Sequence, residues 1–139
     1  MFDRKLLILL LIIGAVAFWA ALTMSAADHG YDAISPQDAW ERLNSDETIV
    51  LIDVRTPEEY VLQRIPGAVL LPLADIKSSA AEVMPEKNAA YFLYCRTGSR
   101  SAQAAALLVS MGYTNIYDLG GIISWPYETE SGQPEQPQP

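Results

Sequence analysis

The chain of 139 residues contains a single cysteine, Cys95, and a single histidine, His29, and this scarcity excludes several kinds of chemistry. A lone cysteine forbids a disulfide within the chain. One cysteine and one histidine do not make a ligand cluster for a metal, so we expect neither a metal nor a cofactor. His29 lies in a linker ahead of the expected folded part, so we also expect no Cys–His catalytic pair.

Basic residues are also scarce after the N-terminus. From Asp28 onward there are 7 lysines and arginines against 16 aspartates and glutamates, a net charge of −9. No basic stripe is present, which excludes nucleic acid and an anionic membrane surface as partners of the folded part. Any anion that binds here is therefore held by local groups against the overall field.

One long hydrophobic run stands at the N-terminus. Leu6 to Met24 carry no charge and follow Arg4 and Lys5. As a helix these 19 residues reach about 28 Å, close to the ~30 Å hydrocarbon core of a bilayer. Residues 1–27 are therefore either a signal peptide, cleaved before Asp28, or a retained transmembrane anchor. Both interpretations place the domain outside the cytoplasm, free in the periplasm or anchored in the inner membrane.

The rest of the chain alternates helical and strand patterns. Ser35 and Thr56 each precede a proline and have an acidic residue three positions later, which predicts two capped helix starts. Further helices are expected over 75–84 and 101–111, and strands over 49–52, 68–71, 90–94 and 115–119, with a tight turn at Gly120–Gly121. This alternation predicts an α/β domain over 28–129, with a mainly parallel sheet covered by helices on both faces. Residues 130–139, rich in proline and glutamine, are expected to form a disordered tail.

The chemistry centres on Cys95, where a buried strand ends and a helix soon begins. In open parallel sheets ligands bind outside the carboxyl ends of the strands. A loop between a strand and a helix directs successive N–H groups into one concavity, which stabilises an anion. The same field lowers the pKa of Cys95 and makes it nucleophilic. The alternative, a small buried hydrophobic side chain, is disfavoured by the two arginines and the glycine that follow it.

The residues after Cys95 are the candidate substrate-binding groups. Arg96 and Arg100 add positive charge at the rim, although each also fits a solvated surface position, Arg96 more so. Gly98 permits a turn that a side chain blocks. Hydroxyl groups that can donate hydrogen bonds belong to Thr97, Ser99 and Ser101.

Four motifs, taken in order, resemble the rhodanese family of single-domain sulfurtransferases over nearly the whole folded part. In chain order they are Asp53-Val54-Arg55 followed by Glu58-Glu59-Tyr60, Ile65-Pro66-Gly67-Ala68, the six-residue loop Cys95–Arg100, and Gly120-Gly121 with Trp125. The resemblance implies a parallel sheet of about five strands and a thiosulfate-type donor. One departure is visible: the family often has Gly-His before Ile-Pro-Gly-Ala, and this chain has Gln63 and Arg64.

The expected reaction carries sulfur as a persulfide on Cys95, passed to cyanide or to a thiol, including a thiol protein. Asp53 and Arg55 are expected to support the loops around the site, or else to form an ordinary surface pair. We expect a monomer, in contact with the membrane only if the N-terminal segment is retained.

Two other functions remain open. Cysteine phosphatases and arsenate reductases place five residues between cysteine and arginine, whereas four separate Cys95 from Arg100, one too few for a tetrahedral oxyanion. A non-catalytic module that binds a partner protein is the second alternative. The presence of Cys95 and both arginines speaks against that alternative.

Overall fold

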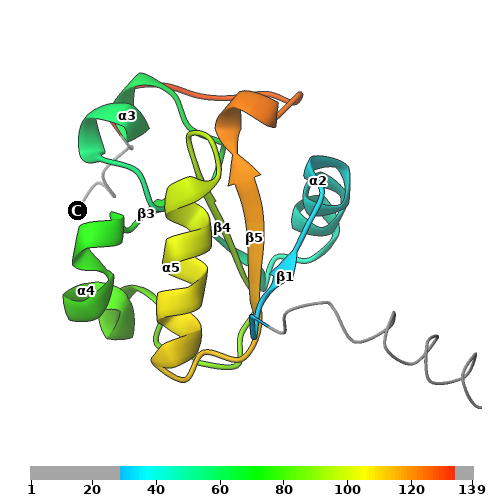
Figure 1. The fold of residues 1–139 in the computed structure, drawn as a ribbon. Coiled ribbons are helices and arrows are strands. Elements are labelled where there is room, and N and C mark those ends of the chain that lie inside the picture. Colours follow the sequence, from blue (N-terminus) through cyan, green and yellow to red (C-terminus); the bar gives the residue numbers. More distant parts are fainter. Residues whose placement is uncertain (1–28, 134–139) are drawn as a thin grey trace, which may run out of the picture.

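The protein, described by a computed structural model over residues 29–133, is built around one parallel β-sheet (Figure 1). Its strands are β1 (Asp32–Ala33), β2 (Val50–Asp53), β3 (Val69–Leu70), β4 (Tyr91–Cys95) and β5 (Ile116–Gly121). They lie in the order β1-β5-β4-β2-β3, and every neighbouring pair is parallel. The predicted α/β class with a five-stranded parallel sheet is confirmed.

Helices cover both faces of this sheet, as predicted (Figure 1). The helices are α2 (Pro36–Ser45), α3 (Pro57–Leu62), α4 (Ile76–Val83) and α5 (Ser99–Ser110), with 3₁₀ turns η1 (Leu73–Asp75) and η2 (Ile122–Ser124). α4 and α5 share one apolar core with one face of the sheet, while α2 and α3 contribute to the core on the other. The central strand β4 is buried along its whole length, which explains its continuous apolar sequence.

Both predicted helix starts are present. The Ser35 hydroxyl accepts the Asp38 N–H at 3.1 Å. Thr56 and Glu59 form a reciprocal capping box, in which each side chain accepts the backbone N–H of the other residue. These caps satisfy N–H groups that have no partner within the helix.

Two predicted boundaries next to Cys95 are wrong. Gly120 and Gly121 are not a turn after the last strand but the end of β5, where they pair with Tyr94 and Cys95. Glycine is depleted in strands in general, so the sequence pattern ends the strand too early. α5 begins at Ser99 rather than Ser101, because Gly98 takes the cap position with a backbone φ of +107°, and glycine is not a side-chain cap.

The two ends of the domain also differ from expectation. The short exposed strand β1 was not predicted. At the other end, Glu130 pairs with Arg64 in an antiparallel bridge, so the folded part extends beyond the predicted boundary at 129. The predicted signal or anchor segment, 1–27, and residues 134–139 of the predicted tail lie outside the described residues. Within 29–133, none of the helices has the length and hydropathy needed to span a bilayer.

Candidate active site

Cys95 is the last residue of β4, in the middle of the sheet, at the edge where the parallel strands end. Its side chain is 1% exposed. The following residues, 96–98, form the connection to α5, and the segment 95–100 is called the cysteine loop below. The central position of β4 brings Cys95 close to both β5 and the first turn of α5.

Hydrogen-bonding groups surround the Cys95 sulfur. The Gly98 N–H donates to Sγ at 3.0 Å, and the Cys95 thiol donates to the Ser101 hydroxyl oxygen at 3.7 Å. Burial raises the pKa of the thiol, but the N–H and hydroxyl of Ser101 and the N–H groups of Gly98 and Thr97 outweigh it. The pKa of Cys95 therefore lies below its ordinary value. The amino end of α5 adds positive potential at the same place.

The cysteine loop lies directly against the end of β5. An added Cβ at Gly121 would stand 2.3 Å from the Arg96 carbonyl oxygen and 2.7 Å from Thr97 Cα. No side chain fits in that space, so glycine is required there for steric reasons. The Ser101 hydroxyl bonds to the carbonyl of Gly120 at 3.3 Å, which ties α5 to the same strand.

The three predicted hydroxyl donors are not equivalent. Ser101 is fully buried and lies at the sulfur. Ser99 is exposed, and its oxygen faces the Gln103 amide at 3.4 Å instead. Thr97 contributes its backbone N–H, while its side chain is exposed. Of these three side chains, only that of Ser101 contacts the reacting atom.

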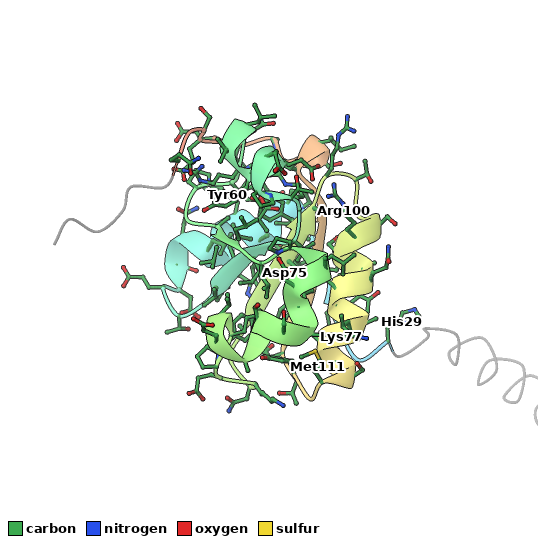
Figure 2. The ribbon with its side chains drawn as sticks, turned by 90° about the vertical axis from the view of Figure 1, so that its left-hand side faces the viewer. His29, Tyr60, Asp75, Lys77, Arg100 and Met111 are labelled. Carbon is green, nitrogen blue, oxygen red and sulfur yellow. The ribbon has the colours of Figure 1, made fainter. Side chains whose placement is uncertain are left out.

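The two arginines of the loop also differ. Arg100, in the first turn of α5, forms a two-pronged ion pair with Glu59 of α3, with N–O distances of 2.7 and 2.8 Å. This hydrogen bonding lowers the pKa of Glu59 to about 2 and raises that of Arg100. Arg96 is exposed, and its guanidinium has no hydrogen-bond or ion-pair partner within 29–133. Figure 2 shows Arg100 at the end of α5 that lies toward α3.

Glu59 was predicted as a helix cap and as part of a family motif, but its pairing with Arg100 was missed. The two residues are 41 positions apart, so no local pattern connects them. The only available signal was topological, because α3 and the start of α5 each follow the end of a strand at the same edge of the sheet.

Asp53 and Arg55 form a buried pair beneath this site. Asp53 is 0% and Arg55 4% exposed, and the guanidinium donates to both carboxylate oxygens. Arg55 also donates to the Gln63 carbonyl at 2.5 Å, which holds the end of α3. This burial excludes the surface-pair interpretation, and the supporting role of the pair remains a prediction.

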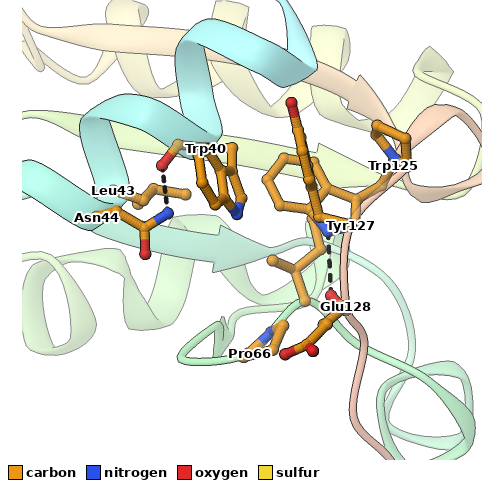
Figure 3. A pocket seen from close by; sticks show the side chains of 9 residues that line it. Trp40, Leu43, Asn44, Pro66, Trp125, Tyr127 and Glu128 are labelled. Atoms are coloured by element: carbon orange, nitrogen blue, oxygen red, sulfur yellow. Dashed lines mark hydrogen bonds between the residues drawn. The ribbon is translucent and has the colours of Figure 1, made fainter.

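A surface hollow of about 820 Å³ lies apart from the cysteine loop (Figure 3). Aromatic rings dominate it: Tyr127 stacks on Trp40 with ring centroids 4.9 Å apart and meets Trp125 edge-on. The cysteine loop contributes no residue to its lining.

Within residues 29–133 no cluster of three histidine, cysteine or acidic side chains is arranged to hold a metal ion. The predicted absence of a metal stays a prediction.

Together, the parallel sheet and a buried cysteine at its edge, whose sulfur accepts a hydrogen bond from the Gly98 N–H, define a class of α/β domain. Comparison with known proteins identifies the family. The family model for the rhodanese-like domain matches residues 35–127, so the chain belongs to the rhodanese-like domain family.

Relatives and solved structures agree with this assignment. The chain is 41% identical over 71 residues to thiosulfate sulfurtransferase PspE of Escherichia coli, covering 51% of this chain and 68% of that protein. It is 38% identical over 93 residues to a sulfurtransferase of Allochromatium vinosum, covering 66% and 85%. A rhodanese from E. coli, solved with anions, superposes with a TM-score of 0.57 at 36% identity, over 60% of this chain and 99% of that one. The predicted class of function, sulfurtransferase, is confirmed.

Proposed function

We propose that this protein transfers sulfane sulfur from a thiosulfate-type donor to cyanide or a thiol, with Cys95 carrying the sulfur as a persulfide. One observation carries the proposal: the Cys95 sulfur is buried, it accepts a hydrogen bond from the Gly98 N–H, and the N–H groups of Thr97 and Ser101 and the Ser101 hydroxyl also lower the pKa of its thiol. This arrangement stabilises negative charge on a sulfur atom at that position. The arrangement therefore stabilises the Cys95 thiolate that begins the reaction.

In the first half-reaction the Cys95 thiolate attacks the outer sulfur of thiosulfate. A bond forms between Sγ and that sulfur, and the bond to the sulfonate sulfur breaks. Sulfite leaves with the electron pair, and Cys95 holds a persulfide. Arg96, exposed at the rim and without an ion-pair partner among residues 29–133, is the group available to the anionic donor.

In the second half-reaction the acceptor attacks the outer sulfur of the persulfide. With cyanide, a carbon–sulfur bond forms, thiocyanate leaves, and the electron pair of the broken bond returns to Sγ as a thiolate. A thiolate acceptor leaves as a persulfide by the same displacement. No proton transfer from a side chain is needed in either step, consistent with the absence of histidine after residue 29.

The dimensions of the cysteine loop favour sulfur over phosphate. Four residues separate Cys95 from Arg100, and Arg100 is already paired with Glu59. A phosphate would have to compete with that carboxylate for the guanidinium. We therefore propose that turnover of aryl phosphates is negligible.

Steady-state kinetics with thiosulfate and cyanide test the proposal. A persulfide intermediate requires parallel lines in double-reciprocal plots, because sulfite leaves before cyanide reacts. Cys95→Ser should abolish thiocyanate formation, whereas Ser99→Ala, which changes an exposed hydroxyl of the same loop, should retain it. Intersecting lines, or activity in Cys95→Ser, would rule out the mechanism.

A protein that accepts sulfur but releases it to no small thiol would favour the alternative, a module dedicated to one partner.

We also propose that the domain acts outside the cytoplasm as a monomer, either free in the periplasm or anchored in the inner membrane. The support for this location is the uncharged run Leu6–Met24 behind Arg4 and Lys5.

A further inference from the structure

Gln63 and Arg64, where this chain departs from the sequence pattern of the family, contact the C-terminal segment of the domain. Residues 129–132, called the C-terminal strap here, lie along α3 and the residues that follow it. Arg64 and Glu130 exchange two backbone hydrogen bonds of 2.8 Å, and the Gly132 N–H donates to the Val61 carbonyl at 2.8 Å. In Figure 1 the C-terminal part of the chain runs from β5 across to α3.

The Arg64 side chain provides most of the remaining contacts with the strap. It is 5% exposed, and its Nε donates to the Glu130 carboxylate at 2.7 Å. Its Nη1 donates to the Gly132 carbonyl at 2.6 Å, and its guanidinium lies 4.6 Å from the centre of the Tyr60 ring. A buried guanidinium needs such partners, because an unpaired buried charge is costly. Arg64 and Glu130 therefore depend on each other.

The strap contacts α3, a helix too short to be stable without tertiary contacts. α3 has six residues, and isolated helices shorter than roughly 12 residues are marginal in water. Besides the buried Tyr60 and the bond from Arg55 to the Gln63 carbonyl, α3 has contacts on two further sides. Glu59 pairs with Arg100 beside the cysteine loop, and Val61 and Arg64 bond to the strap. α3 thus connects the strap to Arg100.

We propose that the C-terminal strap positions the active site by holding α3 where Glu59 reaches Arg100. Arg64 and Glu130 are then positioning residues, and residues 129–132 are part of the functional domain. The proposal has two parts. That the strap maintains the Glu59–Arg100 pair does not depend on the proposed function, whereas the effect on the rate of persulfide formation rests on it.

Titration of the Glu59 carboxylate by NMR is the direct test, in the full chain and in Glu130→Ala. Glu130 is exposed enough, at 45% of its side chain, for this variant to fold. The charged groups nearest Glu59 are Arg100 of α5 and Arg55 after β2, with the Thr56 N–H on its own helix. In the wild type the pKa of Glu59 is about 2, so the carboxylate stays ionised down to low pH. Without the Glu130 carboxylate the strap is held less firmly, and we expect the pKa of Glu59 to rise toward the ordinary value of 4.5.

The sign of the change separates positioning from simple electrostatics. Removing the negative charge of Glu130 would by Coulomb's law lower the pKa of Glu59, whereas release of α3 raises it. Glu58→Gln is the matched control, because it removes a neighbouring exposed carboxylate without touching the strap. It should not raise the pKa of Glu59. An unchanged or lowered pKa in Glu130→Ala would overturn the proposal.

The kinetic consequence is tested by the rate of persulfide formation from thiosulfate. Glu130→Ala and Glu59→Gln should each slow this step several-fold, and the double variant should be no slower than Glu59→Gln alone. Full additivity would mean that the strap acts elsewhere, and would overturn the proposal. If the wild-type protein forms no persulfide at all, the proposed function fails, but the titration still tests the role of the strap.

Discussion

Activation of Cys95 has to come from its immediate surroundings, since the one histidine of the chain lies at the start of the described part, outside the site. The thiol is buried, which by itself opposes ionisation. The N–H and hydroxyl of Ser101 and the N–H groups of Gly98 and Thr97 reverse this, because hydrogen bonds to the sulfur favour the thiolate; the Gly98 N–H lies 3.0 Å from Sγ. A lowered pKa gives more thiolate at neutral pH, and the thiolate is the nucleophile.

Removal of the Ser101 hydroxyl should therefore raise the pKa of Cys95. A net hydrogen bond is worth about 1 kcal/mol, so the thiolate fraction at neutral pH should fall about fivefold in Ser101→Ala. The pH dependence of alkylation by iodoacetamide measures this, with the midpoint shifted to higher pH. Ser99→Ala, two residues earlier with an exposed hydroxyl, should leave the profile unchanged. Equal profiles for Ser101→Ala and the wild type would contradict this account of activation.

At the scale of elements, the end of β5 supports the cysteine loop from below. Gly121 faces the Arg96 carbonyl and the Thr97 Cα at distances that leave no room for a Cβ, whereas an added Cβ at Gly120 has no heavy atom within 4 Å. The cost at Gly120 is conformational instead, because its φ is +84°. The two adjacent glycines are therefore required for different reasons.

This difference predicts different consequences of the two alanine substitutions. Gly120→Ala should lower the free energy of unfolding by about 1–2 kcal/mol through its backbone conformation and largely spare persulfide formation. Gly121→Ala should displace the loop, cost about 1–3 kcal/mol and reduce persulfide formation far more. Urea unfolding and single-turnover mass spectrometry measure both effects. A Gly121→Ala protein that forms the persulfide at the wild-type rate would disprove the steric argument.

Elements with local signals could be predicted from the sequence. The capped starts of α2 and α3 depend on Ser35 and Thr56, and the buried strand β4 on a continuous apolar run. What was missed depends on contacts between distant residues. Gly121 extends β5 because it pairs with Cys95, and Glu59 meets Arg100 through the topology of the sheet.

The candidate site followed the same rule. Cys95 and its loop were located by sequence order alone, because the end of a buried strand fixes where the loop lies. The individual roles within the loop were not predictable in this way. Arg96 is exposed, as its position in the sequence suggested, but the pairing of Arg100 with Glu59 had no local signal.

At the scale of the whole molecule, the excess of acidic residues and the proposed export determine the electrostatic and redox environment of Cys95. The folded part carries no basic patch in its sequence, so the cysteine loop supplies its own field for an anionic donor. A single buried cysteine also avoids pairing with a second thiol within the chain in an oxidising compartment.

The proposed location predicts how the protein partitions in cells. Fractionation should recover it outside the cytoplasm, and N-terminal sequencing of that material distinguishes the two forms. A sequence starting at Asp28 identifies a cleaved signal peptide, whereas an intact N-terminus in the membrane fraction identifies an anchor. Recovery of the full chain in the cytoplasmic fraction would refute export.

The central claim is that Cys95 itself carries the sulfur, and intact mass spectrometry after incubation with thiosulfate tests it most directly. The account predicts that the wild-type protein gains the mass of one sulfur atom and loses it on addition of cyanide, and that Cys95→Ser gains nothing. A wild-type protein with no added sulfur, or a Cys95→Ser protein that still gains one, would contradict the account.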